Sequence, residues 1–204
     1  MLEKLDLKIR QMHKSLGDLK QSDLSTIEPE VLSNQYGLYV NVDFSKGSTE
    51  EGLANIATLL VANIASLKDH LKVWCSRNEI PFNGENLIND NKHVAIVHDL
   101  WNVDKHAELN RKPRSGHHPN IKGLTKMLSV SSGTATSSSA SFTMDINGEM
   151  KVQTSGGGSV NLVITGQVVD ENGVMLGEFN DICEKSTDAW EQELKQAGVS
   201  IPAR

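Results

Sequence analysis

The chain has 204 residues, of which 38% are hydrophobic and 23% are charged, and its formal net charge at pH 7 is −6. This composition is typical of a soluble globular protein and argues against a disordered chain. Aromatic residues make up 4% of the sequence, so no platform for stacking nucleic-acid bases is predicted. Cys75 and Cys183 form no CxxC pair, which argues against a disulfide framework or a zinc knuckle.

The sequence shows no signal for export or for membrane insertion. Its start lacks the positively charged segment and following apolar run of a secretory signal. No window approaches the roughly 20 uninterrupted apolar residues that span a bilayer. We therefore expect a cytoplasmic protein without a membrane segment.

Residues 1–128 are predicted to be mainly helical. Residues 2–20, 48–78 and 85–109 each place apolar side chains at steps of three and four, which indicates amphipathic helices. The second helix must end before Pro81, because proline disfavours helical geometry in the residue ahead of it. Long helices joined by short loops favour an antiparallel helical bundle.

Strand signals dominate the second half of the chain. Residues 25–34 contain Pro29 and are predicted to be a connection, and residues 36–44 alternate like a short strand. A segment rich in serine and threonine begins after Leu128 and is expected to be a flexible linker or a polar strand. Asn147-Gly148, Gly156-Gly157-Gly158 and Asn172-Gly173 are predicted hairpin turns.

The strands are expected at residues 141–146, 149–154 and 159–169, with residues 174–176 pairing back onto the last of them. A helix at residues 180–197 closes the chain, and Gly198 stands where a left-handed C-cap belongs. The predicted class is α+β: an N-terminal antiparallel helical bundle, then a small antiparallel β-meander and a C-terminal helix. The second region, residues 129–204, either forms a separate domain or packs on the first as one domain.

The predicted helix within residues 91–109 has a chemically unusual face. One side carries the apolar residues Ile96, Leu100, Val103 and Ala107. The other side carries the polar or aromatic residues His98, Trp101, Asn102, Lys105 and His106. Because residues four apart are neighbours on a helix, His98, Asn102 and His106 lie one above another. Such a row can hold a phosphate, a proton or a metal, but it is also typical of a solvated surface or of histidines hydrogen-bonded at an interface.

A basic segment follows this helix. Arg111, Lys112 and Arg114 have no acidic residue among them, and Pro113 indicates a loop. We predict that these three residues, together with His98, bind a ligand such as a phosphate group. The simpler alternative is that a short basic loop keeps the protein soluble.

No metal site and no cofactor are predicted. The sequence lacks the HExxH pattern of zinc proteases, and His98 and His106 are two turns apart, so they would need a third ligand from another helix. The triple glycine lacks the spacing of phosphate-binding loops, and no GxSxG nucleophile motif occurs.

The stretch LWNVDKH, residues 100–106, resembles the signature of the HEPN superfamily of helical-bundle proteins. In that signature an arginine and then a polar residue, often asparagine, precede a histidine by about one helical turn or slightly more. Asn102 and His106 match it, whereas Trp101 occupies the position of the arginine. The resemblance spans at most residues 48–110. It implies a dimer whose signature residues face a shared cleft and, in many members, metal-independent RNA cleavage in toxin–antitoxin or phage-defence systems.

In this family the arginine stabilises the phosphate and the histidine performs acid–base chemistry, which an unperturbed histidine can do near neutral pH. We therefore predict a non-catalytic or diverged HEPN-like interaction or RNA-phosphate-binding protein, which forms a homodimer and has an RNA or protein partner. The alternative is a metal-independent ribonuclease of a toxin or phage-defence type, using His106 with Asn102 and Lys105. The missing arginine and the negative net charge favour the non-catalytic function.

Overall fold

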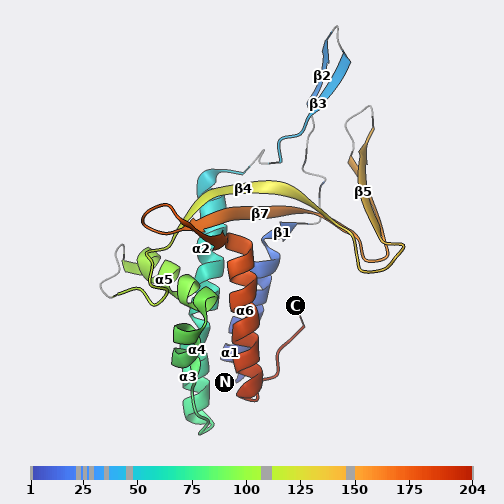
Figure 1. The fold of residues 1–204 in the computed structure, drawn as a ribbon. Helices are drawn as coiled ribbons and strands as arrows, with labels where there is room; N and C mark the ends of the chain where they lie inside the picture. Colours follow the sequence, from blue (N-terminus) through green and yellow to red (C-terminus); the bar gives the residue numbers. More distant parts are fainter. Residues whose placement is uncertain are drawn as a thin grey trace. The chain divides into compact units, whose positions relative to one another are not determined.

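The computed structural model describes the chain except for residues 1, 22–23, 25–26, 28–29, 35–36, 45–47, 107–111, 146–149 and 204. Figure 1 shows its helices and strands. The helices are α1 (Leu2–Gly17), α2 (Glu50–Ala65), α3 (Leu67–Arg77), α4 (Gly84–Asp90), α5 (Lys92–His106) and α6 (Phe179–Gln196). The strands are β1 (Lys20–Gln21), β2 (Glu30–Asn34), β3 (Gly37–Asn41), β4 (Asn120–Ser131), β5 (Ser139–Met144), β6 (Met150–Ser155), β7 (Ser159–Val169) and β8 (Met175–Glu178). The predicted α+β class is confirmed.

The chain divides into two compact units. The first unit comprises Met1–Asp18, Glu51–Leu124 and Thr165–Arg204, and the second comprises Leu19–Glu50 and Thr125–Ile164. Both units take segments from either side of residue 128, the boundary expected from the sequence. No helix in the described part of the chain combines the length and the apolar character needed to cross a membrane.

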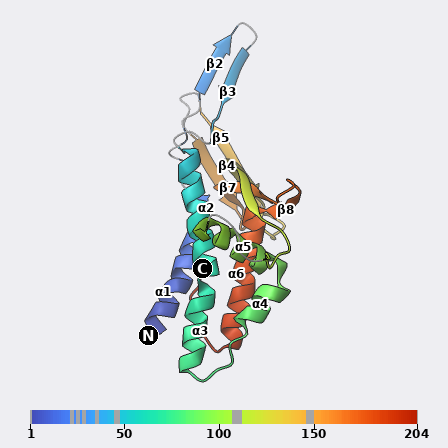
Figure 2. The ribbon, with the colours of Figure 1, turned by 90° about the vertical axis from the view of Figure 1, so that its left-hand side faces the viewer.

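The first unit is a helical bundle. Helix α1 packs against α3 and α6, and α5 packs against α4 and α6, as Figure 2 shows from the side. The buried side chains of α1 are Leu5, Ile9, Met12 and Leu16, which are the apolar positions of the predicted period. The helix itself ends at Gly17, three residues before the predicted end, because the chain enters strand β1 at Lys20.

The prediction of a single helix over residues 48–78 is wrong in one respect, because two consecutive helices form there. Helix α2 ends at Ala65 and α3 begins at Leu67. At the break, the Ser66 hydroxyl donates to the Ala62 carbonyl oxygen at 2.6 Å. A serine that bonds back to the preceding turn competes with the helical hydrogen bonds and commonly bends a helix. The apolar period continues across Ser66, which is why periodicity alone missed the break.

The predicted helix 85–109 is also two helices. Asn91 separates α4 from α5 and has extended backbone angles, φ −108° and ψ 111°. Its side-chain Oδ1 accepts hydrogen bonds from the backbone N–H groups of His93, at 3.0 Å, and Val94, at 3.2 Å. Asn91 therefore caps the start of α5, where the first N–H groups have no partner within the helix. Residues 107–109 of the predicted helix lie outside the described residues.

The C-terminal hairpin and helix agree with their sequence patterns. Strands β7 and β8 pair antiparallel, with Gln167 opposite Glu178, and Gly173 in the turn between them has φ +80°. Helix α6 buries the predicted residues Ile182, Ala189, Trp190 and Leu194. Gly198 has φ +81°, and its N–H bonds to the Lys195 carbonyl oxygen, which confirms the predicted C-cap.

The second unit contains most of the corrections to the strand predictions. Residues 30–34, expected within a connection, form β2 and pair antiparallel with β3. Strand β4 begins at Asn120, eight residues before the predicted change in structure at Leu128. The triple glycine is not a hairpin tip, because it joins β6, which pairs with β5, to β7 of another sheet. The Asn147-Gly148 turn lies outside the described residues.

A small cluster of apolar side chains forms the core of the second unit. Leu24, Ile27, Val160 and Leu162 are its buried members. Strand β1 contributes to the same region by pairing with β7, with Lys20 opposite Val163.

Candidate functional site

The first half of helix α5 is buried on most of its circumference. Val94, Ala95, Ile96, Val97 and Leu100 are each at most 7% exposed. This confirms the predicted burial of Ile96 and Leu100. The predicted division of the helix into one apolar and one polar side is nevertheless too simple, because α5 packs against two neighbouring helices, α4 and α6. Among the polar side chains of this half, Asp99 is buried and His98 is half-buried, whereas Lys92 is exposed.

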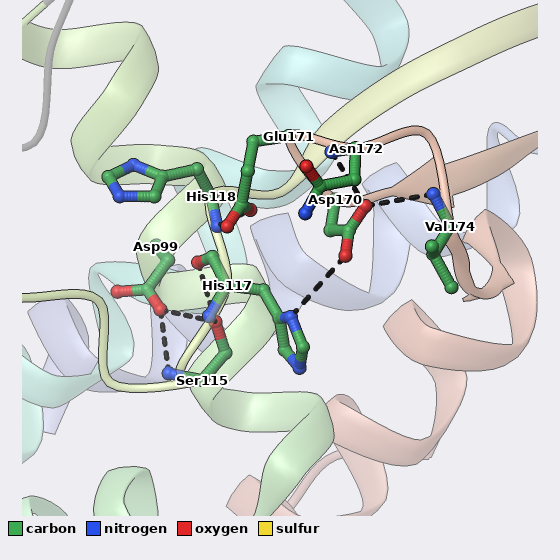
Figure 3. A network of polar contacts seen from close by, with 8 residues as sticks. All are labelled: Asp99, Ser115, His117, His118, Asp170, Glu171, Asn172 and Val174. Atoms are coloured by element: carbon green, nitrogen blue, oxygen red, sulfur yellow. Dashed lines mark hydrogen bonds and ion pairs between the residues drawn. The ribbon is translucent and has the colours of Figure 1, made fainter.

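Asp99 is the most deeply buried polar side chain of α5, with 2% exposure. Its Oδ1 accepts a hydrogen bond from the Arg114 N–H at 3.2 Å. Its Oδ2 accepts from the Ser115 N–H at 2.8 Å and from the Ser115 hydroxyl at 2.7 Å. Figure 3 shows the Asp99 carboxylate facing Ser115. These three hydrogen bonds anchor the loop that follows α5, at Arg114 and Ser115, to the helix.

His98 and Asn102 are brought together as predicted from their spacing. The Asn102 side-chain amide donates to His98 Nδ1 at 2.9 Å. A ring nitrogen that accepts a hydrogen bond carries no proton, so neutral His98 has its proton on Nε2. Burial lowers the pKa of His98, and the positive charges of Lys68 and Arg114 lower it further. His98 is therefore a neutral hydrogen-bonding group at pH 7 rather than a cation.

Arg114 is held against helix α4. Its Nη1 lies 2.8 Å from Glu85 Oε2 and donates to Asn89 Oδ1 at 3.2 Å. Lys68 contacts the same carboxylate, with Nζ 2.8 Å from Glu85 Oε1. The hydrogen bond from Lys68, reinforced by the one from Arg114, lowers the pKa of Glu85 to about 2. Arg114 thus neutralises Glu85, and its predicted role in ligand binding stays a prediction.

The structure describes only some of the remaining predicted site residues. Lys105 and Lys112 are exposed to solvent. Helix α5 ends at His106, but the side chain of His106 and all of Arg111 lie outside the described residues. The predicted row of His98, Asn102 and His106 is therefore described for its first two members.

A second polar group, absent from the sequence analysis, lies beside the loop. His117 Nδ1 is 3.7 Å from Asp170 Oδ2, and the His118 N–H donates to Glu171 Oε2 at 2.9 Å. Asp170 and Glu171 belong to the turn between β7 and β8, and Figure 3 shows their side chains beside His117 and His118. His118 and Glu171 are 53 positions apart in the chain, so sequence spacing gave no signal of this contact.

Two cavities lie in the first unit, and none of the predicted site residues is among their described lining residues. A cavity of about 460 Å³ is bounded by Leu5 of α1 and by His70, Val73 and Trp74 of α3. A smaller one of about 240 Å³ is bounded by residues of α2, α5 and the start of β4. Neither His98 nor Asp99 is among the residues that bound these two cavities.

Comparison of the chain with models of protein families, with curated proteins and with solved structures finds no match. The HEPN-like resemblance is thus supported by Asn102 and His106 in the sequence alone. The function has to be inferred from the contacts of α5 and of the loop that follows it.

Proposed function

We propose that this protein is a non-catalytic RNA-binding protein that contacts RNA phosphates through the basic segment, defined here as residues 112–122. This segment contains Lys112, Arg114 and Lys122 and no acidic residue. Lys112 and Lys122 are exposed, so both ammonium groups are accessible to a polyanion. Contacts between lysine and phosphate are the general source of affinity in such complexes.

The observation that supports this proposal is the anchoring of the segment by Asp99. Burial of a carboxylate is unfavourable unless hydrogen bonds compensate it, and hydrogen bonds to charged groups contribute about 1.5–3 kcal/mol each. Asp99 has three such bonds, all to Arg114 and Ser115. A loop that served solubility alone would need no buried anchor. Because folding already orders the segment, a ligand has less conformational entropy to remove.

Several contacts favour binding without cleavage. Trp101 occupies the position of the family arginine, and a tryptophan cannot stabilise the charge of a phosphate. Arg114, the nearest described arginine in sequence, is paired with Glu85. The Asn102 amide donates to His98, so this signature residue has a partner within its own helix. The HEPN-like resemblance favours RNA as the polyanion and a homodimer as the binding unit.

Fluorescence anisotropy with a labelled single-stranded RNA tests the proposal. The test variant is Lys112→Glu with Lys122→Glu, and the control is Lys72→Glu with Lys195→Glu. The control changes the net charge equally at exposed lysines of α3 and α6. We expect the test variant to bind at least about tenfold more weakly, the control to bind about as well as the wild type, and all binding to weaken as salt rises from about 50 to about 200 mM.

Equal weakening in both variants, or no binding by the wild type at the lower salt concentration, would contradict the proposal. Gel analysis of the same RNA tests the catalytic alternative. Cleavage by the wild type that disappears in His106→Ala would establish the ribonuclease instead. Light scattering of the samples tests the homodimer.

A further inference from the structure

Three potential metal ligands from two distant segments meet in the first unit. They are His117, Asp170 and Glu171, and one ligand atom from each lies within 4.8 Å of the other two. His117 belongs to the loop anchored by Asp99, and the two acids belong to the turn between β7 and β8. In Figure 3 the imidazole of His117 points toward the Asp170 carboxylate.

We propose that His117, Asp170 and Glu171 bind a divalent transition-metal ion, with Zn²⁺ as the best-fitting ion. One imidazole and two carboxylates are a ligand set that zinc accepts, with a fourth position left for water or another ligand. The inference extends beyond the proposed RNA binding and does not depend on it. No metal site was predicted from the sequence, because no local histidine spacing indicates this one.

The distance between His117 and Asp170 suits a shared metal ion better than a direct hydrogen bond. Zinc bonds to nitrogen and oxygen of about 2.0–2.2 Å in a tetrahedral site place neighbouring ligand atoms roughly 3.3–3.6 Å apart. His117 Nδ1 and Asp170 Oδ2 are 3.7 Å apart, which is close to that spacing and too long for a hydrogen bond. The ligand atoms of all three residues lie within 4.8 Å of one another, and His117 is exposed, so rotation of its side chain can shorten its distances to the carboxylates.

Asp170 is fixed in the orientation that a metal ligand needs. The side chain is 8% exposed, and its Oδ1 accepts hydrogen bonds from the backbone N–H groups of Asn172, at 2.9 Å, and Val174, at 2.8 Å. Both of these hydrogen bonds to the Asp170 side chain go to Oδ1. Its other oxygen, Oδ2, faces His117. Contacts of this kind, which orient a ligand from behind, strengthen metal sites.

The backbone also holds the two segments together. The His118 N–H donates to Glu171 Oε2, which holds the Glu171 side chain beside the loop. The charge of the group also favours binding of a cation, because carboxyl groups are ionised at neutral pH. With neutral His117, the two carboxylates contribute a charge of about −2, which a divalent cation neutralises. The competing explanation is an ion pair between protonated His117 and Asp170, which would recruit no metal.

Isothermal titration of the full-length protein with ZnCl₂ at neutral pH, after removal of metals by a chelator, tests the proposal. The test variants are His117→Ala and Glu171→Gln, the second of which keeps an oxygen that can accept the His118 N–H. The matched control is His118→Ala, which removes the neighbouring exposed histidine whose side chain is not in the group. Circular dichroism checks that all variants are folded.

We expect the wild type and His118→Ala to bind one Zn²⁺ per chain, and both test variants to bind at least about tenfold more weakly. Zn²⁺ should also raise the melting temperature of the wild type and of His118→Ala but not of His117→Ala, because a ligand stabilises the state that binds it. The proposal is overturned if the wild type binds no Zn²⁺, or if His117→Ala binds it with wild-type affinity. Equal losses in His117→Ala and His118→Ala would also overturn it.

Discussion

Among the described residues, the helical first unit buries aromatic as well as aliphatic side chains, whereas the buried side chains of the strand-rich second unit are aliphatic. The first unit encloses large residues from several helices, among them Ile9, Leu60, Phe179 and Trp190, each with less than 2% exposure. In the described part of the second unit, the buried cluster consists of four aliphatic residues, and Leu19 and Ile164 are buried as well. Since apolar burial is the main stabilising contribution to folding, the first unit should be the more stable one.

Polar contacts accentuate this difference. In the second unit, serine hydroxyls meet on the surface, such as Ser131 with Ser159 at 2.8 Å and Ser139 with Ser155 at 2.9 Å. Water competes for such exposed hydrogen bonds, so each adds little stability. In the first unit, Asp99 forms its contacts at 2% exposure, where that competition is weak. Both proposed sites therefore lie in the unit whose packing can hold side chains in fixed positions.

Replacing Trp190 with alanine should have the largest effect on the first unit. The side chain is 1% exposed, and removal of a buried tryptophan costs about 3–5 kcal/mol. Urea denaturation followed by circular dichroism measures the loss. Trp190→Phe is the control, because it retains most of the volume, and Nε1 has no hydrogen-bond partner among the described residues. A loss in Trp190→Phe as large as in Trp190→Ala would show that packing volume is not what Trp190 contributes.

Asp99→Ala should be the next most disruptive change. It removes three hydrogen bonds from a buried position, for which we expect a loss of about 2–4 kcal/mol. Hydrogen exchange at the Arg114 and Ser115 amides should accelerate as well, because both N–H groups lose their acceptor. Asp104→Ala, an exposed carboxylate on the same helix, matches the change in charge. Unchanged exchange at both amides would refute the anchoring role of Asp99.

Leu162→Ala tests whether the two units unfold separately. Leu162 is 3% exposed in the small core of the second unit, and a Leu→Ala change in a core costs about 2–3 kcal/mol where the site can partly collapse. All the tryptophans, Trp74, Trp101 and Trp190, belong to the first unit. We expect earlier proteolysis within the second unit but an unchanged urea midpoint by tryptophan fluorescence.

Val152→Ala is the matched control for this change, because Val152 lies in the second unit and is 40% exposed. It should leave both measurements unaltered. If Leu162→Ala lowers the fluorescence midpoint as much as it promotes proteolysis, the two units unfold as one, and the contrast between them does not extend to their stability.

Local patterns predicted the elements whose signals are local. The apolar period of α6, its glycine cap and the Asn-Gly turn between β7 and β8 are each encoded within a few residues, and the structure confirms them. The break at Ser66 was missed, because the apolar period runs through it, and the start of α5 was predicted only to within residues 85–91. Propensity cannot locate a break that depends on one side-chain hydrogen bond.

The candidate site was harder to predict for a different reason. The burial of Asp99 depends on Arg114 and Ser115, which lie 15 and 16 positions further along the chain. The approach of His117 to Asp170 depends on the position of a loop relative to a turn. Nothing in a helical period encodes such contacts between segments. His98 and Asn102 were found in the sequence because their contact lies within one helix.

The ion pairs of Glu85 give the smallest of the predicted effects. Lys68 and Arg114 lower the pKa of Glu85 from 4.5 to about 2, so the ionised form is stabilised in the folded state. This contribution is present above pH 4.5 and is lost as the pH falls toward 2. Because the side chain is 42% exposed, solvent screening should limit this contribution to about 1 kcal/mol or less.

Urea midpoints measured across this pH range should fall less in Glu85→Gln than in the wild type. The exposed Glu79→Gln serves as the control and should fall in parallel with the wild type; if Glu85→Gln does so too, the ion pairs of Glu85 add nothing to the stability of the first unit.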